Sequence, residues 1–236
     1  MAELIAGIDE VGRGCLAGPV YAAAVILPVA PRLRGLRDSK ALTASAREAL
    51  VPRIEARALS WAIGIATPAE IDEINILQAT FLAMRRALAA LAVTPDRCLV
   101  DGNQNPRLGL PTELVIGGDA LHDCIMAASI VAKVARDAEM RRLCAEHPRY
   151  GFSRHKGYGT REHLQALQQH GPCSIHRRSF APCAQGSLDL LDLLADGDSL
   201  LEPVADDVIA IELAAGAERG ANRRSSADDY DGAARA

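Results

Sequence analysis

The feature that most constrains this chain is an apolar run that ends in two adjacent carboxylates. The run begins at Leu4 and ends at Asp9 and Glu10, and a second apolar run follows over 20–27. Both runs are rich in Ile, Val and Ala, which predicts two neighbouring strands. Adjacent carboxylates repel each other, and a divalent cation would relieve that repulsion. The pattern therefore favours a metal site, although a solvated turn with two ordinary loop acids would look the same.

The loop after the two acids narrows these alternatives. It contains Gly12, Arg13 and Gly14, with Gly18 further on. Glycines let backbone N–H groups approach a ligand closely, and arginine is a donor suited to phosphate. A dinucleotide-binding fingerprint is excluded because its glycine spacing differs by one residue. The two acids would also repel a pyrophosphate placed there.

Two further acids follow predicted strands. Additional strands are expected over 61–66, 98–100 and 114–116. The fourth strand runs directly into Asp101, and the fifth is followed by Gly117, Gly118 and Asp119. Ligands of α/β proteins gather beyond strand ends. We therefore expect Asp9, Glu10, Asp101 and Asp119 to converge on one or more cations.

Capping patterns predict where the helices begin. Ser45 with Glu48 reads as a capping box for a helix that ends near Arg57, and Thr67 with Glu70 reads as a second one. Further helices are expected over 76–92, over 122–147 and after Thr160. A short amphipathic helix is expected over 188–201.

Charge is distributed unevenly along the chain. The formal net charge is −4, but residues 187–236 carry 12 acids against 4 arginines, so the remainder is mildly basic. Basic and aromatic residues alternate in the loop 150–160, which suits a nucleic acid but also fits a plain connector. Candidate phosphate contacts are Lys40, Arg154, Lys156, Arg177 and Arg178. The residues from about 185 onward are expected to form an acidic, largely disordered tail.

The six cysteines form no C-x-x-C pair and no zinc-ligand spacing, so they are expected to be reduced. No apolar run reaches the roughly 20 residues of a membrane span, and the N-terminus lacks the pattern of a signal peptide. We therefore expect a cytoplasmic protein with no membrane association.

Residues 4–184 resemble bacterial ribonuclease HII, the type 2 ribonucleases H. The motifs that carry the resemblance are Gly7-Ile8-Asp9-Glu10-Val11-Gly12-Arg13-Gly14, Asp38-Ser39-Lys40, Asn75-Ile76-Leu77-Gln78-Ala79-Thr80, Val100-Asp101-Gly102-Asn103, Gly118-Asp119, residues 127–137 and His155-Lys156-Gly157-Tyr158. Val11 and Cys15 depart from the family's usual Ala and Pro. Neither departure replaces a functional side chain.

The resemblance implies a ribonuclease H-like α/β fold, with a mixed five-stranded sheet flanked by helices and a small C-terminal helical extension. The catalytic domain would cover 1–184 and the acidic tail 185–236. The implied activity is metal-dependent endonucleolytic cleavage of RNA in RNA–DNA hybrids and at single ribonucleotides in duplex DNA, with 5′-phosphate and 3′-hydroxyl products. Such an activity would serve ribonucleotide excision repair. A monomer is implied.

The family's four acidic positions fall on Asp9, Glu10, Asp101 and Asp119, as catalytic residues and ligands of Mn²⁺ or Mg²⁺. Substrate-binding positions fall on Gly12, Arg13, Gly14 and Tyr158, and Lys40 is a further candidate. Tyr158 would sense the RNA–DNA junction. Two alternatives stay open: a type 3 ribonuclease H of the same fold, and a catalytically silent nucleic-acid-binding module.

Overall fold

The computed structural model describes residues 3–31, 33–36, 42–184, 203–204 and 208–209. Its centre is a mixed sheet of five strands in the order β3-β2-β1-β4-β5. The strands are β1 Ile5–Val11, β2 Val20–Ile26, β3 Ser60–Ala66, β4 Arg97–Asp101 and β5 Thr112–Val115. β2 runs antiparallel to β1 and β3, whereas β4 and β5 run parallel to β1. The expected mixed five-stranded sheet is thus confirmed.

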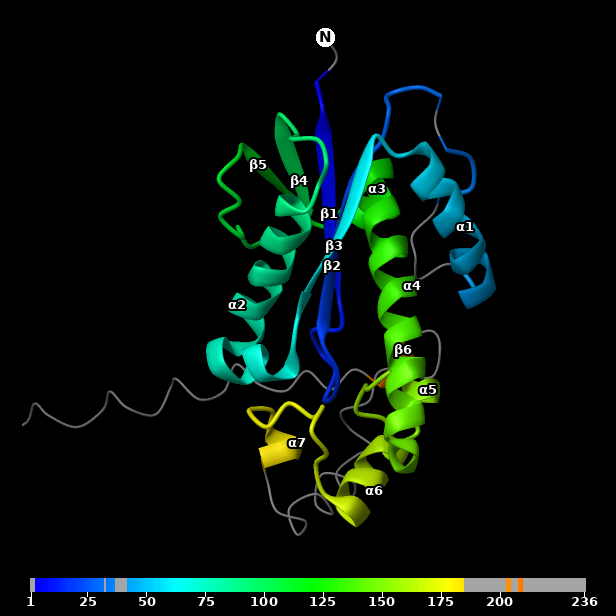
Figure 1. Cartoon of the computed structure of the whole chain (residues 1–236), viewed down its shortest axis with the longest axis vertical. Coiled ribbons are helices and arrows are strands. Elements are labelled where there is room, and N and C mark those ends of the chain that lie inside the picture. The colour runs from blue at the N-terminus through cyan, green and yellow to red at the C-terminus, as the bar shows by residue number, and fades with distance from the viewer. Residues whose placement is uncertain (1–2, 32, 37–41, 185–202, 205–207, 210–236) are drawn as a thin grey trace, which may run out of the picture.

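Helices cover both faces of this sheet (Figure 1). Helix α2 (Pro68–Ala89) lies on one face, and α4 (Asp123–Glu146) with α1 (Ala44–Arg57) lies on the other. Strand β2 is buried along its whole length, because alternate residues face the two helical layers. Ala22 and Ala24 pack in the core under α2, and Ala23 and Val25 in the core under α4.

Small residues let the helices approach the sheet closely. A Cβ at Gly64 would lie 2.0 Å from the carbonyl oxygen of Ala83 on α2. A Cβ at Gly7 would lie 2.2 Å from the carbonyl carbon of Cys124 at the start of α4. Any larger residue at Gly7 would push α4 away from β1, the strand that carries the first acidic pair.

The helix starts confirm one capping prediction and correct another. Thr67 and Glu70 form the complete capping box at the start of α2. At α1 the cap is Thr43, whose hydroxyl accepts the N–H of Ala46, so the prediction of a box at Ser45 was wrong. Thr43 has the extended backbone of an N-cap residue, while Ser45 already lies inside the helix.

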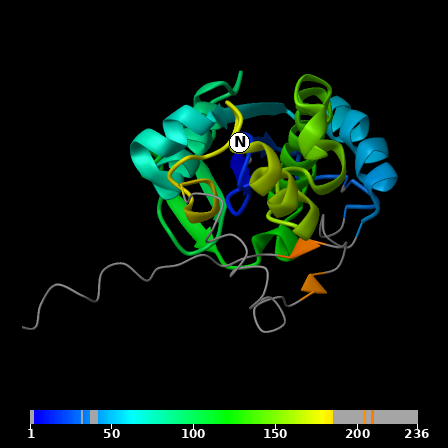
Figure 2. The ribbon, with the colours of Figure 1, turned by 90° about the horizontal axis from the view of Figure 1, so that it is seen from below.

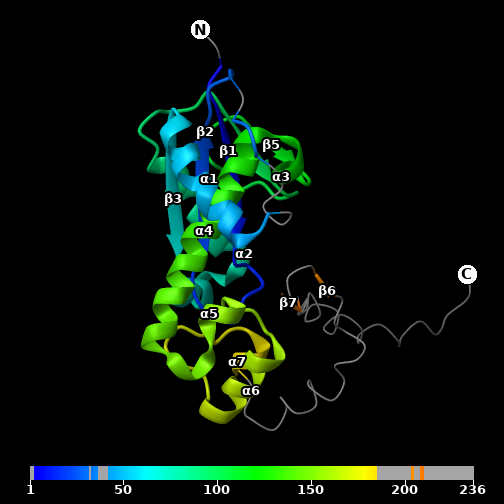
Figure 3. The same cartoon turned by 90° about the vertical axis from the view of Figure 1, so that its right-hand side faces the viewer.

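The C-terminal short helices gather beyond one end of the sheet (Figures 1 and 3). These elements are the 3₁₀ turn Pro148–Tyr150, α5 Phe152–His155, α6 Arg161–His170 and α7 Ala181–Ala184. Helix α3 (Gly118–Leu121) lies elsewhere, against β4 and the start of α4. Thr160 caps α6 as predicted, by accepting the N–H of His163. Seen from below, along the long axis, these C-terminal segments lie in front of the strands (Figure 2).

The segment after α6 returns to the glycine-rich loop that follows β1. The N–H of Arg177 donates to the carbonyl of Leu16, and the N–H of Gly18 donates to that of Ile175, both at 2.9 Å. An isolated antiparallel bridge joins Ala17 to His176 between them. Segments about 160 residues apart in the sequence therefore form one structural unit beside the acidic end of β1.

Further along, Pro203–Val204 (β6) pairs antiparallel with Val208–Ile209 (β7), which was not predicted. The expected helix over 188–201 lies outside the described residues, and so does most of the tail expected to be disordered. The boundary of the catalytic domain at 184 stays a prediction.

Candidate active site

Strand register brings the predicted acids of β1 and β4 together. Ile8 is the register partner of Val100 across the parallel pair β1–β4, so Asp9 and Asp101 come next on adjacent strands. Asp101 in turn pairs with Val115, near the end of β5. Because neighbouring parallel strands end at the same edge of a sheet, Asp9 and Asp101 lie at one edge, as the sequence predicted.

Asp119 reaches this edge through a short helical turn rather than directly from a strand. It lies in α3, four residues beyond the end of β5, and is only 6% exposed. The N–H of the preceding residue, Gly118, donates to Oδ1 of Asp101 at 2.7 Å. The backbone before Asp119 is thereby tied to the carboxylate of Asp101.

The carboxylates at this edge repel one another. Burial raises the pKa of Asp9 well above its usual value, and the charges of Glu10 and Asp101 raise it further. A hydrogen bond from Ser129 on α4 partly offsets this effect. Burial and Asp101 also raise the pKa of Glu10, while Arg13 lowers it. Ionisation of Asp9 and Glu10 is therefore unfavourable unless a positive charge lies close to them.

The chemistry of these donors fits a hard divalent cation. All four predicted ligands are carboxylates, the ligand type that Mg²⁺ and Mn²⁺ prefer, and a cation would relieve the repulsion that raises the pKa of Asp9 and Glu10. Within the described part of the chain, no three His, Cys, Asp or Glu side chains already stand in a metal-holding arrangement. Which of the four carboxylates hold the cation therefore stays a proposal.

The glycine-rich loop adjoins the acids and exposes its tip. Gly12 has φ = 93°, a conformation that residues with a Cβ rarely adopt. Arg13 and Gly14 are exposed, whereas Gly12 and Cys15 on either side are buried. The guanidinium of Arg13 lies 3.4 Å from the Glu10 carboxylate, so it partly neutralises the acidic pair.

Arg177 does not have the predicted role of a phosphate contact. Its side chain is fully buried, and it donates to the carbonyl oxygens of Gly12, Arg13 and Gly18. The prediction was wrong because a pair of adjacent arginines looks like a basic surface. Only Arg178, the second of the pair, is exposed.

Tyr158 lies against the same loop. Its hydroxyl hydrogen-bonds to Cys15, and the electrostatic effect of Cys15 together with burial raises the pKa of Tyr158. The guanidinium carbon of Arg136 lies 5.9 Å from the centre of the Tyr158 ring. Cys15, which had no physical explanation in the sequence, is therefore a direct neighbour of the predicted junction-sensing residue.

The other predicted phosphate contacts are scattered. Arg154 is exposed and paired with Glu162. The ammonium of Lys156 donates to the carbonyl of Ser153, and burial lowers its pKa. Lys40 lies outside the described residues. Arg154 and Lys156 therefore already have partners within the protein.

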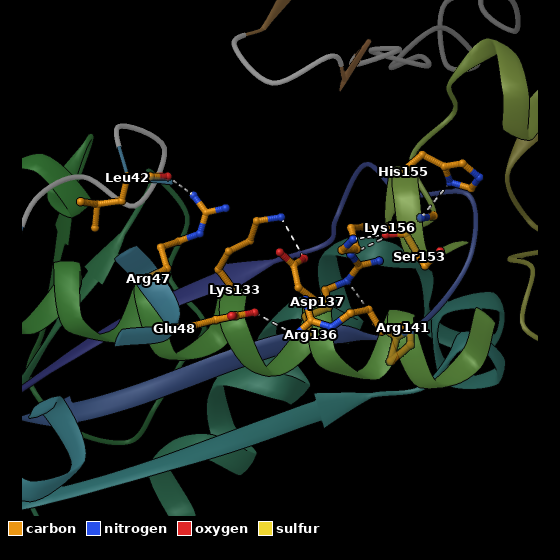
Figure 4. Close-up of polar contacts among 12 residues, drawn as sticks. Leu42, Arg47, Glu48, Lys133, Arg136, Asp137, Arg141, Ser153, His155 and Lys156 are labelled. Carbon is orange, nitrogen blue, oxygen red and sulfur yellow. Dashed lines mark hydrogen bonds and ion pairs between the residues drawn. The ribbon is translucent and has the colours of Figure 1, made fainter. Parts of the chain in front are cut away.

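The basic half of α4 is largely neutralised by partners (Figure 4). Lys133 pairs with Asp137 at 2.9 Å, and Arg141 pairs with Glu48 of α1 at 3.0 Å. Arg136 is fully buried and donates to the carbonyls of Pro19, Lys156 and Ala17. This half of the helix is thus less available to a polyanion than its composition indicated.

Sequence reasoning missed three buried histidines beneath Tyr158. His163 donates from Nδ1 to the carbonyl of Tyr158 at 2.8 Å, and its Nε2 lies 3.0 Å from Nε2 of His176. The ring of His155 stacks on that of His163 with centroids 4.5 Å apart. A signal was present for His163, because it shares the apolar face of α6 with Leu164 and Leu167.

Comparison with known proteins decides the family. The family model described as ribonuclease HII matches residues 6–183. The chain belongs to the ribonuclease HII family. It is 58% identical to ribonuclease HII of Bordetella pertussis over 182 residues, which is 77% of this chain and 90% of that protein. The resemblance inferred from the motifs is confirmed.

Solved structures of ribonucleases H2 and HIII share the fold. The ribonuclease H2 of Pyrococcus horikoshii superposes with a TM-score of 0.67 and 26% identity, covering 80% of this chain and 99% of that one. Bst-RNase HIII in complex with Mn²⁺ superposes at 0.65 with 19% identity, covering 81% and 70%. The latter similarity supports the fold alone.

As a ribonuclease HII, the protein is a hydrolytic endoribonuclease that acts on RNA–DNA hybrids and depends on a divalent metal. Among the described residues, no helix is both long and apolar enough to cross a membrane.

Proposed function

We propose that the carboxylates of Asp9, Glu10, Asp101 and Asp119 form the catalytic centre and hold Mn²⁺ or Mg²⁺. The observation that carries this proposal is the strand register, which places Asp9 and Asp101 at adjacent positions of β1 and β4, with Glu10 next to Asp9. Bst-RNase HIII has been solved with Mn²⁺ bound, which supports the choice of ion on the shared fold.

Residues around the centre hold its carboxylates in place for the bound cations. Bound cations would lower the pKa of the attacking water and offset charge on the scissile phosphate and the leaving oxygen. Ser129 holds the Asp9 carboxylate from α4, and the N–H of Gly118 holds that of Asp101. These contacts orient the carboxylates before the substrate arrives, which reduces the reorganisation needed during cleavage. The products would carry 5′-phosphate and 3′-hydroxyl ends.

Substrate selection would lie in the loop beside the acids. Only the 2′-hydroxyl distinguishes one ribonucleotide from its DNA neighbours. Arg13 and Gly14 are exposed and Gly12 beside them is buried, and these three residues lie two to four positions from Glu10. Tyr158 packs against the same loop through Cys15. We therefore assign recognition of the ribose to Gly12, Arg13, Gly14 and Tyr158. The substrates would include single ribonucleotides in duplex DNA, which fits a role in ribonucleotide excision repair.

Two alternatives are less well supported. A type 3 ribonuclease H shares the fold, but the type 3 structure is only 19% identical, whereas the Bordetella type 2 enzyme is 58% identical. A silent nucleic-acid-binding module would not need a buried, mutually repelling group of acids beside its binding loop, because these acids repel phosphate.

The proposal also covers the catalytic domain, the oligomeric state and the location of the protein. We assign catalysis to residues 1–184, since the family model ends at 183, and we expect a monomer in the cytoplasm. A chain truncated at Gly186 should then keep the turnover of the full chain. A large loss of turnover on truncation would show that the acidic tail takes part in catalysis.

The proposed function is tested with a duplex that contains one ribonucleotide, incubated with Mn²⁺ and then with chelator. We expect a nick on the 5′ side of the ribonucleotide, with 3′-hydroxyl and 5′-phosphate ends, that stops when chelator is added. An all-DNA duplex of the same sequence is the control. Cleavage of long hybrids without any nick at the single ribonucleotide would contradict the assigned substrate range.

A further inference from the structure

Arg177 is a buried cation whose guanidinium group donates hydrogen bonds to backbone carbonyls. Its Nη2 donates to Gly12 at 2.6 Å and to Gly18 at 2.9 Å, its Nη1 donates to Arg13 at 2.7 Å, and its Nε donates to Gly18 at 3.0 Å. Burying a guanidinium is costly unless its donors are satisfied. Its shortest hydrogen bonds are to the carbonyls of Gly12 and Arg13, at the start of the exposed tip of the glycine-rich loop.

The hydrogen bonds of Arg177 fix the orientation of two successive peptide groups. In a trans peptide the carbonyl oxygen and the following N–H point in opposite directions, and both peptide bonds concerned are trans. The carbonyls of Gly12 and Arg13 both point at the buried guanidinium. The N–H groups of Arg13 and Gly14 therefore point away from it, and both residues are exposed.

Two adjacent N–H groups that face the same way form a site for an anion or a hydroxyl oxygen. The positive φ of Gly12 permits this backbone path. The same donors lie three and four residues after Glu10 in the sequence. Arg177 therefore sets the direction of these two N–H groups, from the opposite side of the loop backbone.

Arg177 is itself rigidly held. Its N–H donates to the carbonyl of Leu16. On its C-terminal side, the carboxylate of Asp72 on α2 accepts the N–H groups of Arg178 and Ser179 at 3.0 and 2.9 Å. The guanidinium carbon also lies 5.2 Å from the centre of the Phe180 ring. A group anchored on two sides can position a loop with the precision that recognition requires.

We propose that Arg177 is a positioning residue for substrate selection, which aims the N–H groups of Arg13 and Gly14 at the ribose 2′-hydroxyl and its adjoining phosphate. This inference rests on the proposed role of the loop in reading the ribose. It assigns a specificity function to a side chain that never touches the substrate.

The test measures discrimination of the 2′-hydroxyl in binding, so it does not depend on turnover. Every variant carries Asp9→Asn to prevent cleavage. Fluorescence anisotropy gives the Kd for two duplexes that differ by a single 2′-hydroxyl, and the ratio of the two Kd values is the readout. A fraction of unfolded protein changes both Kd values equally and leaves the ratio unchanged.

Arg177→Lys keeps the charge but cannot span the three carbonyls. We expect the ratio to fall about fivefold toward one, the effect of losing one well-formed hydrogen bond, while the Kd for the all-DNA duplex changes less than about twofold. An unchanged ratio in Arg177→Lys would overturn the proposal.

Arg47→Lys is the matched control. Arg47 is also buried and donates from Nη1 to a backbone carbonyl at 2.6 Å, but this carbonyl belongs to Leu42, just before α1, and not to the glycine-rich loop. The ratio should be retained in this variant, and an equal loss in both variants would overturn the assignment to Arg177. If the ratio is already one with Arg177 intact, the loop does not read the ribose, and the proposed function fails rather than the role of Arg177 alone.

Discussion

The carboxylate of Asp101 accepts the N–H of Gly118 at 2.7 Å, which ties the end of β4 to the turn that carries Asp119. This contact links two acids that are 18 positions apart in the sequence. It also means that the position of Asp101 depends on the space available at Gly118.

Gly118→Ala should therefore impair cleavage more than stability. A Cβ at this position would lie 3.3 Å from Oδ1 of Asp101, 3.2 Å from Val115 Cβ and 2.6 Å from Ile125 Cδ1. The isoleucine tip can move, but a displaced Asp101 carboxylate should lower kcat by about tenfold to hundredfold. Single-turnover cleavage at saturating Mn²⁺ measures this loss.

Gly109→Ala is the control for the previous prediction. Gly109 has φ = 77°, and no atom lies within 4 Å of the point where a Cβ would stand, so substitution adds backbone strain without a clash. We expect a loss of stability of about 1 kcal/mol with kcat unchanged. A kcat for Gly118→Ala as high as that of Gly109→Ala would contradict the role of the Asp101–Gly118 contact.

Asp9→Asn should raise stability while it removes activity. Burial and the charges of Glu10 and Asp101 disfavour the ionised form of Asp9 and raise its pKa, and asparagine removes this cost. In chelator, urea unfolding should show a gain of about 1 kcal/mol, an ordinary size for one substitution. Cleavage should fall by about two orders of magnitude or more, since each ~1.4 kcal/mol of lost transition-state stabilisation is tenfold. Lower stability together with retained cleavage would contradict the assigned role of Asp9.

The buried histidines should make the fold sensitive to acid. Burial lowers the pKa of His163 to about 3 and that of His176 to about 4, below the unfolded value of ~6.5. Below pH ~6.5 the unfolded chain binds more protons than the folded one, so stability falls as pH falls toward these values. Each histidine should contribute a slope of about 1.4 kcal/mol per pH unit between pH 6 and 5.

His163→Gln isolates one of these contributions. The raised pKa values of Asp9 and Glu10 act in the opposite sense, because their protonation favours the folded state as pH falls. The informative quantity is therefore the difference in slope between wild type and variant, from urea unfolding at pH 5 and 6. A difference of about one proton is expected, and identical slopes would show that His163 is not held neutral.

Tyr158→Phe should affect single ribonucleotides more than long hybrids. The substitution removes the hydroxyl that bonds to Cys15 but keeps the ring. We expect kcat/KM to fall about tenfold on a single embedded ribonucleotide, with a smaller loss on a long hybrid where many ribose groups are available. Equal losses on both substrates would argue against junction sensing.

Cys15→Ala tests the other partner of this hydrogen bond. It leaves the Tyr158 hydroxyl in place without its thiol acceptor. If the thiol only orients Tyr158, the variant should show the same substrate pattern as Tyr158→Phe with a smaller loss. An unaffected Cys15→Ala would mean that the tyrosine is oriented by its other contacts, such as the Arg136 guanidinium.

The proximity of Asp9 and Asp101 could be predicted from sequence because its signal is local. Each acid follows a short apolar run, and strand pairing turns that pattern into proximity, as the register of Ile8 with Val100 shows. Asp119 deviates from this rule, since a glycine turn and α3 separate it from β5. Capping at Thr67 was equally local, whereas Ser45 and Thr43 offered competing caps that only the backbone path distinguishes.

The supporting residues could not be predicted, because their partners are distant in sequence. Arg177 contacts Gly12 across 165 positions, and nothing in its neighbourhood shows that this cation is buried. Arg136 likewise reads as part of a basic helix end, although its donors reach the loop after β1. A buried arginine that donates to backbone carbonyls has no characteristic sequence pattern, either in periodicity or in composition.

The metal centre is best tested by the thermal stability of wild type and of the double variant Asp9→Asn/Asp101→Asn, each titrated with Mn²⁺ against a chelator control. Binding to the folded state alone adds about 2.7 kcal/mol at a hundredfold excess over Kd. We predict that the Tm of wild type rises with Mn²⁺ and saturates, while the Tm of the double variant stays constant. An equal rise in both proteins would contradict a metal centre built on these two acids.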